Sequence, residues 1–270
     1  MTAVTVSLPR RVASTVVRNP RWRHALGLVV VLARKNVKIR YKRASMGLLW
    51  AVGQPLLQAA VLTIVFTRVF RGQRIPDYGL FVLCGVMPYS AINTGIQSAC
   101  VSVVDNAALV KKVMLPRLVF PFAAVGGTLS VFAASLSVLV VFAGLSGTLG
   151  MHTLLLPVAV LAIVLVMLSV GVFAAALYVQ YRDVKFILES GLLMLFYASP
   201  VFYTSERLGS LAPWQRLNPV TGVLSLVRGS LVGLPVDWIA VAITGGFGAI
   251  LLLVGIVVFQ RRAQLFADLT

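Results

Sequence analysis

Residues 40–70 change within a few positions from a basic segment into a long apolar run. Arg40, Lys42 and Arg43 come first, and the run from 48 to 70 that follows holds one charged residue, Arg68, near its end. A helix needs about 20 apolar residues to cross the roughly 30 Å of hydrocarbon in a bilayer. We therefore predict that the chain enters a membrane at this point.

The rest of the chain has the composition of a membrane protein. Of its 270 residues, 59% are hydrophobic and only 11% are charged, whereas about a quarter of the residues of a soluble domain are charged. Residues 1–23 are basic, lack an apolar run of signal-peptide length, and are expected to be a flexible N-terminus before a membrane domain at 24–270. We predict an all-α polytopic membrane protein with six transmembrane helices, at about 48–70, 79–104, 118–143, 154–179, 186–203 and 238–259.

The net charge of +17 indicates how the chain is oriented in the membrane. In the six-span topology, 18 Lys and Arg residues lie on the side that holds both termini, and six lie on the other side. Cytoplasmic loops of membrane proteins carry an excess of these residues. We therefore predict a multi-pass protein with both termini in the cytoplasm, and we attribute the basic charge to topology rather than to a nucleic acid partner.

A helix with a basic face is predicted at 24–43, before the first span. One of its faces is basic and the other apolar, although Arg40 and Arg43 interrupt the apolar face. This composition favours an amphipathic helix that lies flat in the cytoplasmic interface of the membrane. The alternative is a polybasic tail that only fixes the orientation of the chain.

A second short cytoplasmic helix is predicted within residues 105–117. Asp105 or Asn106 is suited to cap it and Pro116 to end it. Leu109 and Val113 give this helix an apolar edge, which lies beside the basic Lys111 and Lys112. A stiff helix at the cytoplasmic surface suits the transmission of force from another protein. The alternative is a simple positively charged loop.

Polar residues inside the spans allow two interpretations. Asn93 and Gln97 are four residues apart in the second span and share a helix face with Ser90. This polar stripe either joins helices by hydrogen bonds or lines a pore. Glu189, in the fifth span, is expected to pair with a nearby Lys or Arg rather than to act in a proton relay.

The longest external region contains the last short apolar stretch. This stretch lies between Pro219 and Pro235, contains Arg228, and is too short to cross a bilayer. Short helices of this kind can enter a membrane and leave it on the same side, provided that protein surrounds the non-helical backbone at their ends. We therefore predict short external re-entrant helices at about 205–235.

Several kinds of chemistry are missing from the sequence. No G-x-x-x-x-G-K-[ST] phosphate-binding loop occurs, so ATP is not bound by that route. The two histidines, His24 and His152, lie on opposite sides of the membrane in this topology, and neither a metal site nor a Ser/His/Asp set can be built from them. We expect a protein that is not itself an enzyme, has no metal and no cofactor, and takes energy for uphill transport from a partner.

Four stretches match a known family in order and spacing, and they cover the chain from about residue 30 to its end. With them, the chain resembles the permease subunits of ABC-2 type polysaccharide exporters, which export lipid-linked O-antigen, teichoic acid and related glycans. The stretches are Arg40-Tyr41 with Met46 to Ala51 and Gln54-Pro55-Leu56; Asp105-Asn106 through Lys111-Lys112-Val113 to Leu115-Pro116-Arg117; Tyr181 to Val184 with Ala198 to Tyr203; and Leu217 to Val220 leading to Arg228-Gly229.

This resemblance implies a half-transporter of the bacterial cytoplasmic (inner) membrane. It implies a homodimer that works with two copies of a separate ABC ATPase, which binds ATP and Mg²⁺. The helix at 24–43 corresponds to the family's interface helix and 105–117 to its coupling helix, while 181–183 marks a second cytoplasmic contact. The expected ATPase-coupling residues are Asp105, Asn106, Leu109, Lys111, Lys112, Val113, Tyr181, Arg182 and Asp183.

The substrate implied is a glycan on a polyprenyl diphosphate, which needs a continuous channel rather than a small pocket. Sugar faces stack on aromatic rings, and sugar hydroxyls need polar partners. We expect the channel lining to include Trp50, Gln54, Phe66, Phe196, Tyr197, Phe202 and Tyr203; ordinary helix packing or interfacial belts are the alternative roles. The basic helix is expected to attract the diphosphate at the inner leaflet through Lys38, Arg40, Lys42 and Arg43.

Two other functions remain possible on the sequence alone. ABC-2 subunits also export drugs and small lipophilic compounds, although the Arg-Tyr to Gln-Pro and Tyr-Arg-Asp to Pro-Val-Phe-Tyr segments are closer to the glycan branch. A membrane scaffold or an intramembrane enzyme would work without an ATPase. The enzyme would need a catalytic constellation, and none is visible in the sequence.

Overall fold

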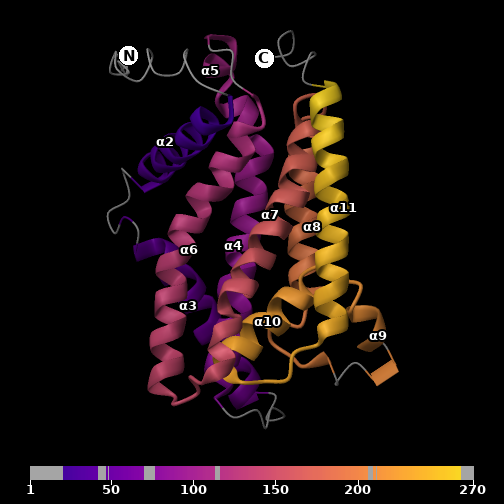
Figure 1. The fold of residues 1–270 in the computed structure, drawn as a ribbon. Helices are drawn as coiled ribbons and strands as arrows, with labels where there is room; N and C mark the ends of the chain where they lie inside the picture. The colour runs from indigo at the N-terminus through magenta and orange to yellow at the C-terminus, as the bar shows by residue number, and fades with distance from the viewer. Residues whose placement is uncertain are drawn as a thin grey trace.

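The computed structural model describes residues 21–41, 47, 49–69, 77–112, 116–205, 209–210 and 212–262. All regular structure within these ranges is helical, as predicted (Figure 1). The elements are α2 (Arg21–Tyr41), α3 (Leu49–Ile64), η1 (Val65–Val69), α4 (Tyr78–Asp105), α5 (Ala107–Lys112), α6 (Val119–Leu145), η2 (Met151–Leu155), α7 (Leu156–Tyr178), α8 (Val184–Ala198), α9 (Ala212–Gln215), α10 (Thr221–Val232) and α11 (Trp238–Arg262).

Five helical segments of the described chain are long and apolar enough to cross a membrane, by length and composition. They overlap five of the six predicted spans, and the crossing of a membrane by each stays a prediction. The segments are Leu49–Arg68, where α3 continues into the π-helical η1; α4; α6; Met151–Tyr178, where η2 continues into α7; and α11.

The predicted fifth span, 186–203, is not helical throughout. Its helix, α8, has 15 residues and ends at Ala198, short of the length that crosses a bilayer. Pro200 disfavours the helical conformation at the residue before it, and Ser199 accordingly adopts extended backbone angles, φ −91° and ψ 150°. The segment after Ser199 is therefore free to turn back towards the bundle.

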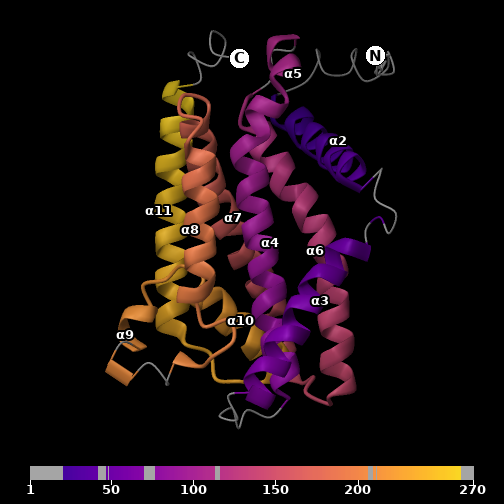
Figure 2. The same cartoon turned by 180° about the vertical axis from the view of Figure 1, so that it is seen from behind.

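Helix α4 lies at the centre of the bundle, and α6, α7, α3, α8 and α10 pack around it (Figures 1 and 2). Most of its residues are buried. The contact between α4 and α7 depends on a small residue, since a Cβ added at Gly171 would lie 2.6 Å from the Cβ of Ala99. Small residues let membrane helices approach closely, which is how they gain contact energy in lipid.

Helix α2 lies across the end of α6 at which α5 is also found (Figure 1). Leu32 and Ala33 are buried on its α6 side, whereas the basic Arg34, Lys35 and Lys38 are exposed. The backbone of Ala33 comes so close to Gly127 of α6 that an added Cβ would lie 3.2 Å from its carbonyl oxygen. The division into a basic and an apolar face follows the prediction, and a place in the membrane interface stays a prediction.

Two short helices occupy the opposite end of the bundle. These are α9 and α10, and they fall within the predicted range 205–235 (Figure 1). Ten of the twelve residues of α10 are buried, against α4, α7, α11 and η2. A helix of twelve residues is too short to span a membrane, and α10 instead fills the space between the longer helices at this end of the bundle.

Candidate functional site

The chain after α8 is fixed by Asn218, which follows α9. Its side-chain amide donates a 2.9 Å hydrogen bond to Ser199 Oγ, and its oxygen accepts one of 2.9 Å from the backbone N–H of Val220. Ser199 Oγ in turn donates to the carbonyl of Leu195 at 2.6 Å. Two of the stretches that carry the family resemblance, 198–203 and 217–220, therefore form one structural unit.

Aromatic rings from two distant parts of the sequence gather beside this unit. Phe202 lies 5.0 Å from Phe66 of η1, 6.1 Å from Phe196 of α8 and 5.2 Å from Tyr203, measured between ring centroids. Phe196 also lies 5.3 Å from Tyr197. These five residues, which we call the aromatic cluster, are five of the seven expected to line the channel, and the structure brings them together.

The seven expected channel residues differ in exposure. Tyr197 is exposed, Phe66, Phe202 and Tyr203 are half-buried, and Phe196 is buried inside the chain. The two others, Trp50 and Gln54, are exposed on the first turns of α3, away from the cluster. Part of the ring surface of the cluster is therefore exposed at the surface of the chain, and the rest is packed inside it.

Two tyrosines of α4 that the sequence analysis did not select support the aromatic cluster. The hydroxyl of Tyr78 donates a 2.7 Å hydrogen bond to the carbonyl of Phe202, and that of Tyr89 donates to the carbonyl of Leu192 in α8. The ring of Tyr89 lies 5.1 Å from that of Phe196. Tyrosines buried in an apolar helix need such partners for their hydroxyl groups, and this need is the sequence signal that could have identified them.

Tyr203 links the cluster to α9. Its hydroxyl accepts a 3.0 Å hydrogen bond from Gln215 Nε2 and donates one of 3.3 Å to the carbonyl of Tyr197. Tyr203 therefore joins the aromatic cluster to α9 and to the end of α8.

Arg228 of α10 is buried directly behind this region. Its guanidinium donates a 2.7 Å hydrogen bond to the carbonyl of Val201 and stacks over the ring of Phe81 in α4, 3.6 Å from the centroid. A Cβ at Gly85 would overlap the Val201 carbonyl oxygen and meet the guanidinium, so α4 needs a glycine here. The sequence marked Arg228 as a single Arg in an apolar stretch, but it did not indicate that Val201 and Phe81 would be its partners.

The polar stripe of α4 keeps its hydrogen bond within the helix. Gln97 Nε2 donates to Asn93 Oδ1 at 2.7 Å, and both residues and Ser90 are half-buried. Figure 2 shows α4 between α3 and α8, and both helices pack on it. Within the described residues, the stripe forms no hydrogen bond with a neighbouring helix, and the pore-lining interpretation stays a prediction.

Glu189 of α8 pairs as expected. Its Oε1 lies 3.9 Å from Nζ of Lys185, one turn earlier, and both side chains are more than a third exposed. An exposed pair of this kind contributes at most about 1 kcal/mol to stability. The prediction of pairing is confirmed.

The expected ATPase-coupling residues lie in two places at the α5 end of the molecule (Figure 1). Asp105, Asn106 and Leu109 lie where α4 passes into α5, while Tyr181, Arg182 and Asp183 form the exposed turn between α7 and α8. Within the predicted range 105–117, α5 covers Ala107–Lys112, and residues 113–115 lie outside the described residues. Val113 and the side chains of Lys111 and Lys112 lie outside the described residues.

Asn106 connects α2 with the junction of α4 and α5. Its amide donates a 2.8 Å hydrogen bond to the carbonyl of Ser102, and its oxygen accepts a 3.3 Å hydrogen bond from Nζ of Lys35. Within the described residues, the hydrogen bonds of this side chain thus reach α4 and α2 rather than the start of α5. Of the four residues expected to meet the lipid diphosphate, Lys38 is exposed on α2; the side chain of Arg40, and Lys42 and Arg43, lie outside the described residues.

Comparison with known proteins gives consistent matches over most of the chain. The sequence profile of the ABC-2 type transporter family matches residues 27–232. Two proteins of Klebsiella pneumoniae named O-antigen export system permease protein RfbA are 28% and 27% identical over 245 residues, covering 90% of this chain and 94% of each relative. A protein of the same name from Myxococcus xanthus is 30% identical over 203 residues, covering 74% of this chain and 78% of the relative.

Proposed function

The chain belongs to the ABC-2 type transporter family, and from this we propose that it is the permease half of an ATP-driven exporter of a lipid-linked polysaccharide. The relatives it matches over most of both lengths are named for O-antigen export. The cargo we propose is a polyprenyl-diphosphate glycan of the O-antigen, teichoic acid or galactan kind. The translocated chain would cross the bacterial cytoplasmic membrane.

The aromatic cluster is the observation that carries this proposal. The rings of Phe66 and Phe202 come from the first span and from the chain after α8, and their centroids are 5.0 Å apart. Aromatic faces bind the apolar faces of sugars without demanding one orientation, which suits a polymer that must slide. We propose that the exposed rings, with Trp50 and Gln54, line the path of the glycan.

We place this path between two copies of the chain. Large apolar side chains are exposed along both helices that flank α4, for example Leu57 and Val61 on α3 and Leu193 and Met194 on α8. Exposed apolar surface of this extent marks contact with lipid or with another protein. A homodimer through α3 and α8 would enclose the aromatic rings and the polar stripe of α4 in one channel.

The membrane topology we propose has six segments and cytoplasmic termini. The sixth segment is α8, which would complete its crossing with residues 199–203 under cover of α9 and α10. Non-helical backbone at membrane depth is tolerated where protein surrounds it, and Asn218 and Arg228 supply hydrogen bonds to this segment. The basic α2 would lie in the cytoplasmic interface.

Energy would come from two copies of an ABC ATPase that bind ATP and Mg²⁺. The two places that hold the expected coupling residues, the α4–α5 junction and the α7–α8 turn, lie at one end of the bundle (Figure 2). The hydrogen bond between Asn106 and Lys35 would pass a movement of α5 to α2. The lipid diphosphate would approach along α2, towards Lys38, Arg40, Lys42 and Arg43.

The test is export in the native host. Deletion of the gene should leave the lipid-linked glycan inside the cell, measured as the fraction of glycan that is inaccessible to an external glycosidase. The variant Phe202→Ala should restore export several-fold less well than the wild type, while Phe247→Ala, on the exposed face of α11, should restore it fully. Normal glycan at the surface of the deletion strain would refute the proposed function.

A further inference from the structure

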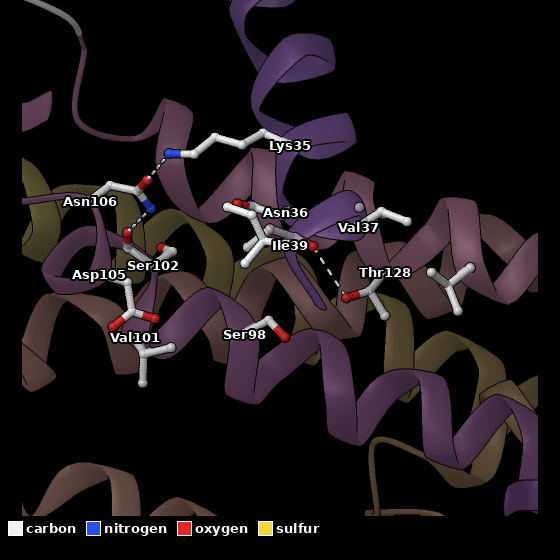
Figure 3. A pocket seen from close by; sticks show the side chains of 13 residues that line it. Lys35, Asn36, Val37, Ile39, Ser98, Val101, Ser102, Asp105, Asn106 and Thr128 are labelled. Carbon is white, nitrogen blue, oxygen red and sulfur yellow. Dashed lines mark hydrogen bonds between the residues drawn. The ribbon is translucent and has the colours of Figure 1, made fainter. Parts of the chain in front are cut away.

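A cavity of about 380 Å³ lies between α2, α4 and α6 (Figure 3). It is distinct from the aromatic cluster and lies at the α5 end of the bundle, next to the junction of α4 and α5. Small residues of α6 leave the space open, since Ala124 and Gly127 face α2 and α4 here. The two charged side chains among its described lining residues, Lys35 and Asp105, are exposed, so the cavity is accessible from the surface.

The lining of this cavity combines polar and apolar side chains. In Figure 3, Asp105 and Asn106 lie on one side with Val101 beside them, and Val37 and Thr128 lie on the other. A molecule that matches both kinds of side chain has a polar head and an apolar body. Because α2 is predicted to lie in the membrane interface, the molecules of this kind that surround it are membrane lipids.

The charges in the lining select the kind of head group. One cation, Lys35, and one anion, Asp105, give the described lining a net charge of zero. The Lys35 ammonium uses one donor for Asn106 and has two more to offer. The Asp105 carboxylate has no hydrogen bond or ion pair within the described chain, so it is able to accept from a cation. A diphosphate, with several negative charges, would meet the Asp105 carboxylate at a cost in free energy.

We propose that this cavity binds the head group of a zwitterionic phospholipid of the phosphatidylethanolamine type. Lys35 binds the phosphate, Asp105 binds the ammonium, and the acyl chains lie along the apolar part of the lining. The bound lipid thereby bridges α2 and the α4–α5 junction. This inference goes beyond the proposed function, because the lipid is a resident ligand and not the exported cargo.

The test measures lipid binding to the delipidated full-length protein by native mass spectrometry. The probes are palmitoyl-oleoyl phosphatidylethanolamine, the matching phosphatidylglycerol and undecaprenyl diphosphate. We expect the first to bind most tightly and Lys35→Ala to weaken it about tenfold, the loss expected of one charge-assisted contact. Asp105→Asn should weaken phosphatidylethanolamine but not phosphatidylglycerol, because only the former carries an ammonium. Arg34→Ala, exposed on α2 and outside the lining, is the matched control.

A second pair of variants tests the cavity without changing a charge. Val131→Trp fills the cavity and should abolish tight binding, whereas Ala133→Trp, exposed on α6 and outside the lining, should preserve it. Both proteins are compared by size-exclusion chromatography to show that they are folded. Equal binding of all three lipids, equal effects of Lys35→Ala and Arg34→Ala, or tightest binding of undecaprenyl diphosphate would each overturn the proposal. None of these results depends on export.

Discussion

The guanidinium of Arg228 lies 3.6 Å from the centroid of the Phe81 ring, inside the helix bundle. The same group donates a 2.7 Å hydrogen bond to the carbonyl of Val201. Arg228 therefore joins α10, α4 and the chain that follows α8, which carries Phe202 and Tyr203. The position of the aromatic cluster depends on this contact between three segments that are distant in the sequence.

Replacing Arg228 by Met should destabilise the protein. The Val201 carbonyl would lose its partner, and leaving a buried polar group unpaired costs roughly 1–3 kcal/mol. The stacking on Phe81 would be lost as well. Thermal unfolding in detergent should show a lower midpoint for Arg228→Met and an unchanged one for Arg261→Met, which is exposed at the end of α11. Equal midpoints for the two variants would contradict the proposed role of Arg228.

Replacing Gly85 by Ala should also destabilise the protein, for a steric reason. The added methyl group would overlap the Val201 carbonyl oxygen, and forcing extra volume into a packed core costs roughly 1–3 kcal/mol. Gly191→Ala is the matched control, because a Cβ at Gly191 of α8 meets nothing within 4 Å. We expect a lower midpoint of thermal unfolding for the first variant only. A stable Gly85→Ala protein would show that α4 and the Val201 segment are further apart than described.

The side-chain hydrogen bonds of Asn218 can be separated by substitution. Asn218→Asp keeps the acceptor for the Val220 N–H but removes the amide group that donates to Ser199 Oγ and, at 3.5 Å, to the carbonyl of Ala198. Asn218→Ala removes all three bonds. Since each lost bond costs roughly 0.5–1.5 kcal/mol, Asn218→Ala should lower stability more than Asn218→Asp. Limited proteolysis of the segment after α8 should show the same order, with Gln260→Ala, exposed near the end of α11, cut as slowly as the wild type. The reverse order would remove Asn218 from this role.

The pair of Arg216 and Asp237 should make stability depend on pH in acid. Partial burial alone raises the pKa of Asp237. Hydrogen bonds from Arg216 and from the N–H groups of Ala240 and Ile239 together lower it by more than burial raises it. The pKa of Asp237 in the folded protein therefore lies below the ordinary value. A carboxylate of this kind stabilises the folded state above its unfolded pKa, and the stabilisation is lost as the pH falls through the folded pKa.

The loss should therefore occur below about pH 4, the ordinary pKa of Asp. Because both side chains are about a third or more exposed, the stabilisation that is lost should be less than about 1 kcal/mol. Comparing Asp237→Asn with the wild type between neutral and acid pH, by thermal unfolding, checks it. The difference between the two proteins should shrink in acid; a constant difference would show that Asp237 acts only as a cap of α11.

The spans could be predicted because they depend on local sequence. Long apolar runs such as 118–143 and 154–179 cannot be exposed to water and are long enough to cross a bilayer, so their helices followed from composition and length. The resemblance of the four stretches then gave the family, which the match at 27–232 shows. The prediction failed at the end of the fifth span, where hydropathy continues beyond Ala198 but Pro200 does not allow the helix to continue.

The arrangement of the site came only from the tertiary structure. Phe66 and Phe202, Arg228 and Phe81, and Lys35 and Asn106 are contacts between segments far apart in the chain. The sequence by itself determined which segments leave water, because that depends on the hydropathy of each segment alone. It did not determine which segments become neighbours, because apolar helices gain little from one another over lipid, and the choice depends on the fit of small residues such as Gly85 against a distant carbonyl.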